Sequence, residues 1–89
     1  MNEIYKVLEK SKSIEILVVL YGEKKVFLSE LLLKLKTKDT NTINRRIETL
    51  RNAGLIKDET EAKFGGRRYI WLTDKGKKVA SYLKNIEKI

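Results

Sequence analysis

The segment from about Thr40 to Ala53 constrains the fold more than any other part of this 89-residue sequence. Its apolar residues Ile43, Ile47 and Leu50 recur at helical spacing and form one stripe, and Gly54 follows as a residue type that ends helices. The other positions are mostly polar, as in a helix with one face in a core and one in solvent. The sequence therefore predicts an amphipathic helix here.

Two apolar segments lie near the N-terminus. Helical spacing of the apolar residues at positions 4–8 predicts a short first helix that breaks at residues 11–13. The next segment, Ile14 to Tyr21, is apolar on all sides, which indicates a central buried helix. A buried strand is the competing interpretation of this β-branched run, but Ser13 as an N-cap and Gly22 as a stop favour the helix.

A further helix is expected between this segment and the amphipathic one. A short extended piece around Lys25 to Phe27 precedes it, and Ser29 is its expected N-cap. Polar residues from Lys36 to Thr40 then form a turn. The apolar side of this helix follows the i, i+3, i+4, i+7 rule and consists of Leu28, Leu31, Leu32 and Leu35.

A β-hairpin is expected after the amphipathic helix. Residues from Leu55 to Glu59 and from Arg68 to Leu72 read as strands, joined through a loop that holds Gly65 and Gly66. On the second strand we expect Tyr69 and Trp71 to pack in the core or on a dimer surface, with base stacking as the less favoured role.

The last segment predicts a C-terminal helix that starts at Thr73 and Asp74. One side of it is apolar and could fold back on the first helix. In so short a chain, however, residues 74–89 are also a natural dimerisation helix. The expected dimer residues are Val79, Tyr82, Leu83, Ile86 and Ile89.

In this order, the elements resemble a known family. The stretches "LSELLLKL" (28–35), "NTINRRIETLRNAGLI" (41–56) and "GGRRYIWLTDKGKKVA" (65–80) resemble those of small prokaryotic winged helix-turn-helix regulators of the MarR, ArsR and PadR groups. The resemblance implies one α+β, mostly helical domain over residues 1–89, with an N-terminal helix, a two-stranded wing and a C-terminal helix. It also implies double-stranded DNA and a second copy of the chain as partners.

Charge and composition restrict the function. The chain has 20 Lys and Arg against 12 Asp and Glu, a net charge of +8, so a polyanionic partner is plausible, although a solvated lysine surface is the alternative. With no Cys and no His, the chain lacks thiol nucleophiles, imidazole bases and the usual zinc ligands. We expect no metal, no cofactor and no enzymatic activity, and the resemblance cannot extend to thiol-based metal or redox sensing.

The outward face of the amphipathic helix mixes amides, hydroxyls and arginines, which is the chemistry that reads base edges in the major groove. An ordinary solvated face is the alternative, and Glu48 counts mildly against DNA. We expect base contacts from the N-terminal half of the helix and phosphate or rim contacts beside it. The two sets are Asn41, Thr42, Asn44 and Arg45, and then Arg46 and Thr49.

In the wing, Lys63, Arg67 and Arg68 bring charge to the Gly-Gly loop, and Arg67 is the expected minor-groove or phosphate contact. The alternative is that these arginines are cross-strand partners of acidic residues. The candidate acidic partners are Asp58, Glu59 and Glu61.

The sequence thus predicts a sequence-specific DNA-binding regulator that acts as a homodimer. Two alternatives are a low-specificity chromatin-type protein and a winged-helix protein-interaction module. No segment reads as a membrane span or a signal peptide, so a cytoplasmic protein is expected. The target sequence and any small-molecule effector are not visible in the sequence.

Overall fold

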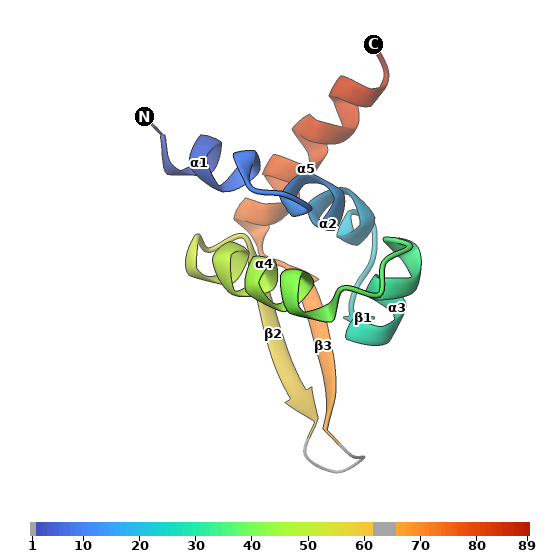
Figure 1. The fold of residues 1–89 in the computed structure, drawn as a ribbon. Coiled ribbons are helices and arrows are strands. Elements are labelled where there is room, and N and C mark those ends of the chain that lie inside the picture. Colours follow the sequence, from blue (N-terminus) through green and yellow to red (C-terminus); the bar gives the residue numbers. More distant parts are fainter. Residues whose placement is uncertain (1, 62–65) are drawn as a thin grey trace.

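The computed structural model describes residues 2–61 and 66–89. Within them the helices are α1 (Glu3–Glu9), α2 (Ser13–Leu20), α3 (Leu28–Lys34), α4 (Thr40–Asn52) and α5 (Asp74–Glu87). The strands are β1 (Val26–Phe27), β2 (Ile56–Glu61) and β3 (Arg67–Leu72). Figure 1 shows the helices gathered into one body from which β2 and β3 run outward side by side. The predicted α+β, mostly helical architecture is confirmed.

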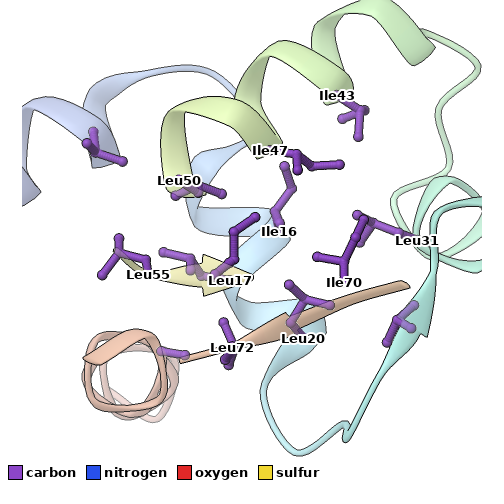
Figure 2. Close-up of a cluster of buried hydrophobic side chains, with 14 residues drawn as sticks. Ile16, Leu17, Leu20, Leu31, Ile43, Ile47, Leu50, Leu55, Ile70 and Leu72 are labelled. Carbon is purple, nitrogen blue, oxygen red and sulfur yellow. The ribbon is translucent and has the colours of Figure 1, made fainter. Parts of the chain in front are cut away.

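The core is built around α2. Its residues Ile16, Leu17 and Leu20 are buried, and the stripe of α4 packs into the same cluster together with Ile70 of β3 (Figure 2). The central helix and the inward stripe Ile43, Ile47 and Leu50 are therefore confirmed. The helix α2 is nevertheless buried on one side only, because Ile14 and Tyr21 stay exposed.

The three strands form one antiparallel sheet in the order β1, β3, β2, so the extended piece at Val26 and Phe27 is a third strand beside the hairpin. Side chains alternate between the two faces of a strand. Ile70 and Leu72 point into the core, which puts Tyr69 and Trp71 on the opposite, outer face of the sheet, partly exposed. The expectation that these two rings pack in the core was wrong.

Two predicted helix caps were also wrong. Ser13 is the first residue of α2 and is fully buried, while Lys12 precedes the helix with a left-handed φ of 70°. Ser29 lies inside the first turn of α3, because β1 pairs up to Phe27 and the helix starts directly after it. Glu30 stabilises that start, since its Oε1 accepts a hydrogen bond from the Phe27 N–H at 3.3 Å.

The last helix, α5, begins as predicted, with the Thr73 hydroxyl accepting from the Gly76 N–H at 3.0 Å. Val79 and Leu83 pack against the core. The C-terminal part of α5 extends away from the helical body, and both chain ends lie on the side away from the β2 and β3 hairpin (Figure 1). The exposed apolar residues on this part of the chain are Tyr82, Ile86 and Ile89.

Candidate nucleic-acid interface

The N-terminus of α4 is held by Asp39. Its carboxylate accepts from the Thr42 N–H at 3.1 Å and from the Thr42 hydroxyl at 2.6 Å. Both bonds lower the pKa of Asp39, and the bond from the Thr42 hydroxyl has the larger effect. The helix therefore starts at a defined residue, and the hydroxyl proton of Thr42 is engaged within the protein.

The outward row of α4 starts with Asn41 and Arg45, whose side chains are exposed. Among the described residues, neither side chain has a hydrogen-bond or ion-pair partner, so both can contact another molecule. Glu48 continues the row one turn later and is exposed too.

Two other candidate residues of α4 make contacts within the protein. Arg46 donates through Nε to the backbone oxygen of Ser11 at 2.7 Å, which ties α4 to the segment between α1 and α2. The Thr49 hydroxyl donates to the Arg45 backbone oxygen one turn earlier at 2.9 Å. The guanidinium of Arg46 is directed toward the N-terminal part of the chain, at the edge of the helix face.

A polar network joins α4 to the hairpin through Asp58. Arg68 on β3 donates through Nε to Asp58 Oδ2 at 2.8 Å, and through Nη1 to the amide oxygen of Asn44 at 2.9 Å. Arg51 of α4 reaches the other carboxylate oxygen of Asp58 at 3.2 Å. The cross-strand alternative considered for Arg68 is thus present in the structure. Four side chains from three elements hold the hairpin against α4.

Burial and neighbouring charges shift the pKa of Asp58 in opposite directions. Its partial burial raises the pKa, but the hydrogen bonds and positive charges of Arg68 and Arg51 outweigh that effect, so the pKa lies below the usual value. Asp58 is therefore ionised at neutral pH and compensates the charge of Arg68, which is itself only 23% exposed.

The charged residues of the hairpin differ in their surroundings. Arg67 is exposed on the outer face, with its guanidinium carbon 5.2 Å from the centre of the Phe27 ring. Lys63 lies outside the described residues. On the same outer face, Lys25 lies over the Trp71 ring at 4.7 Å. No local sequence pattern indicates this contact, because Lys25 is 46 positions from Trp71 and comes close to it only through the pairing of β1 with β3.

A family model described as a winged helix DNA-binding domain matches residues 10–76. The chain belongs to this winged helix family. Its helix-turn-helix consists of α3, the turn at residues 35–39 and α4, and β2 with β3 is its wing. The expected winged helix-turn-helix fold is confirmed, and so is the expectation that this is a DNA-binding domain.

Solved winged helix structures have the same fold. A protein described as a MarR-family transcriptional regulator from Porphyromonas gingivalis W83 aligns with a TM-score of 0.87 and 19% identity, over 96% of this chain and 82% of that one. A transcriptional regulator homologue from Pyrococcus horikoshii OT3 aligns with a TM-score of 0.74 and 20% identity, over 99% of this chain and 92% of that one. A protein described as an HxlR-family transcription factor from Thermoplasma volcanium GSS1 aligns with a TM-score of 0.82 and 21% identity, over 96% of this chain and 75% of that one. At these identities the likeness shows a shared fold.

The comparison with curated proteins gives no match. Within residues 2–61 and 66–89 there is no group of three or more His, Cys, Asp or Glu placed to hold a metal ion. None of the helices in this part of the winged helix domain is long and apolar enough to cross a membrane.

One residue that shapes the interface, Asp39, was not singled out in the sequence. Asp39 has a detectable signal, because an Asp directly before a helix is a favoured N-cap. Asp58 was considered only as a wing partner, and its bond to Arg51 of α4 follows from tertiary packing.

Proposed function

We propose that this winged helix protein is a homodimeric regulator of transcription that binds specific sequences of duplex DNA. The helix α4 would enter the major groove, and the wing would lie along the backbone or in the adjacent minor groove. The observation that carries the proposal is the exposed pair Asn41 and Arg45 at the N-terminal half of α4, with the wing projecting beside it.

The contacts are assigned from the surroundings of each side chain. Arg45 and Asn41 are the strongest candidates for base edges, because Arg pairs with guanine O6 and N7 and Asn with adenine N6 and N7. Beside them Thr42 can still accept through its hydroxyl oxygen. Asn44 is a further candidate for a base contact, and its amide oxygen also accepts a hydrogen bond from Arg68. The residues proposed for phosphate or rim contacts are Arg46, Thr49, Lys63, Arg67 and Arg68.

Dimerisation is proposed through the exposed end of α5. Its apolar residues Tyr82 and Ile86 are exposed, and so is Tyr5 of α1. Burying such side chains against a second copy removes apolar surface from water. Because both chain ends lie on the side away from the wing, a dimer made there leaves α4 and the wing free.

The test is a selection of bound duplexes from a random pool, followed by titration of the enriched site. We expect an enriched, pseudo-palindromic site with half-sites about one helical turn apart or a multiple of it. Affinity should fall log-linearly with salt, with a slope of about 0.9 per phosphate neutralised.

The other outcomes are informative. Tight binding without enrichment would favour a low-specificity chromatin-type protein. Failure to bind any duplex at low salt would contradict the proposal and favour a protein-interaction module.

A further inference from the structure

The turn between α1 and α2 consists of Lys10, Ser11 and Lys12, and it is tied to α4 by Arg46. Arg46 donates through Nε to the backbone oxygen of Ser11 at 2.7 Å and through Nη2 to the Ser11 hydroxyl oxygen at 3.5 Å. The serine hydroxyl is the acceptor in the second bond, so its own proton remains available to donate. The 10–12 turn is thus held at the side of α4, with Ser11 exposed.

The 10–12 turn and the wing lie on opposite sides of α4. The wing contacts α4 at Asn44 and Arg51, whereas the turn contacts it at Arg46. At about 100° per residue, Arg46 lies about 160° around the helix from Asn44 and about 140° from Arg51. The exposed Arg45 lies between the two sides. Figure 1 shows the same arrangement, with the segment between α1 and α2 above α4 and the wing below it.

A helix in the major groove has a phosphate backbone on each side, because the groove is about 12 Å wide and a helix with its side chains is about 10–12 Å across. The wing is on one side of α4, so the 10–12 turn is next to the backbone on the other. Lys12 lies near the start of α4, since its positive charge, after the bonds from Thr42, helps to lower the pKa of Asp39. The turn is therefore placed to meet the second backbone.

The two lysines of the turn are available to a partner. Lys10 is exposed and Lys12 is partly exposed. In the part of the chain that the structure describes, neither ammonium group has a hydrogen-bond or ion-pair partner. Ammonium groups and hydroxyls are among the groups that bind the phosphates of duplex DNA.

Local structure gives no reason for a lysine at position 12. The φ of Lys12 is 70°, a left-handed value that is uncommon for a residue with a Cβ atom. Lys12 also directly precedes α2, where its side chain makes no capping bond and the positive end of the helix dipole disfavours a cation. Glycine or asparagine would suit this backbone better. A residue that conflicts with its local structure in two ways points to a contact outside the chain.

We propose that the 10–12 turn is a second DNA-backbone contact of this protein, in which Lys10, Lys12 and the Ser11 hydroxyl bind phosphates on the side of the major groove away from the wing. This inference rests on the proposed function and adds a contact to it. Glu9 and Glu15 flank the turn in the sequence, so its effect depends on close ammonium–phosphate contacts and not on a large net charge. Such contacts hold the protein on the duplex without reading bases.

The experiment measures binding of the full chain to the selected duplex and to a random duplex at several salt concentrations. The variants are Lys12→Asn, Lys12→Arg, Lys10→Gln and the control Lys78→Gln. Asparagine tolerates left-handed backbone and removes the charge, whereas arginine keeps the charge. Lys78 is exposed on α5 and lines a groove with Trp71, on the outer face of the sheet and away from α4.

Lys12→Asn should weaken binding to both duplexes by about 5- to 10-fold near 0.1 M salt and reduce the salt slope by about 0.9, the effect of one phosphate. Lys10→Gln should act in the same way, whereas Lys12→Arg and Lys78→Gln should bind like wild type. The preferred sequence should not change. Urea denaturation should show that Lys12→Asn is at least as stable as wild type, which separates loss of a contact from loss of the fold.

The position of the contact is tested with duplexes in which single phosphates are replaced by uncharged methylphosphonates. One replacement should weaken binding of wild type but not of Lys12→Asn. A different replacement should weaken binding of wild type but not of Arg67→Ala. We expect the bases that α4 contacts to lie between these two phosphates.

Several results would overturn the inference alone. One is a Lys12→Asn variant whose affinity and salt slope change no more than those of Lys78→Gln. Another is that the phosphate coupled to Lys12 lies on the same side of the contacted bases as the phosphate coupled to Arg67. Failure of wild type to bind any duplex at low salt would instead overturn the proposed function, and this inference with it.

Discussion

At the scale of single residues, the partly buried Asp58 matters most for the stability of this domain. It pairs with Arg68 at 2.7 Å and with Arg51 at 3.2 Å, and these two arginines come from different elements. Arg51 is exposed, so its pair contributes little, whereas loss of the Asp58 charge would leave the partly buried Arg68 without a negatively charged partner.

Asp58→Asn should destabilise the protein by about 1–3 kcal/mol at pH 7. The folded-state pKa of Asp58 lies below its unperturbed value of 3.8. Its stabilising contribution is therefore complete above that value and is lost as the pH falls through the folded-state pKa. Urea denaturation at pH 7 and at several values below 4 measures the difference between variant and wild type. A difference that stays constant with pH would contradict this account.

Substitution of Arg45 and substitution of Arg67 should weaken DNA binding in different ways. Arg45→Ala should cost about 1–3 kcal/mol on the preferred duplex and relax the preference at one base position. Arg67→Ala should weaken all sequences more evenly and reduce the salt slope by about one. Titrations with the selected duplex, single-base variants and random duplex at several salt concentrations distinguish the two. If Arg45→Ala weakened every duplex equally, Arg45 would not read a base.

At the scale of elements, the first turn of α5 is packed directly on the backbone between α4 and β2. Gly76 is fully enclosed there, and a Cβ atom on it would overlap the carbonyl oxygen of Leu55 and lie 2.9 Å from the carbonyl carbon. The Thr73 N–H also donates to that carbonyl oxygen at 3.1 Å. Glycine is needed at this helical position for close approach and not for helix formation.

Gly76→Ala should therefore destabilise the domain by about 1–3 kcal/mol, as overpacking does. The sign of the change in unfolding free energy is informative, because at an exposed helical position a Gly→Ala change stabilises the protein by about 1 kcal/mol. Thermal or urea unfolding measures it. Lys78→Ala, two positions along and exposed, is the control and should stay within about 0.5 kcal/mol of wild type. A stabilised Gly76→Ala variant would show that α5 can shift away from Leu55.

At the scale of the whole molecule, the proposed dimer depends on the exposed end of α5. Leu83 packs against the core, so a charge there would disturb folding as well as assembly. Ile86 is 62% exposed and serves the test better. It lies one residue before the C-terminal end of α5.

Ile86→Lys should give a folded monomer that binds the selected duplex more weakly, because a lysine cannot be buried unpaired in an apolar seam. Sedimentation equilibrium of wild type and variant at micromolar concentration measures assembly, and circular dichroism monitors the fold. Asn85→Lys, exposed on the neighbouring side of α5, is the control and should remain dimeric. A monomeric wild type would refute the dimer.

Much of the fold followed from local sequence patterns. The stripe Ile43, Ile47 and Leu50 predicted both the existence of α4 and its inward face, and the structure confirms both. Thr73 and Gly54 marked an element start and an element end correctly. These signals are reliable because helical periodicity and backbone freedom act over one or two turns, and distant residues are not needed to produce them.

What the sequence determined by itself was the order of the elements, the inward face of α4 and the excess of positive charge. Only the tertiary structure decided which polar side chains remain available for a partner. Asn44 and Arg68 are 24 residues apart and meet because the wing packs against α4, and Tyr69 faces outward because Ile70 beside it takes the core position. Periodicity specifies the face on which a residue lies, whereas its hydrogen-bond partners depend on how separate elements pack.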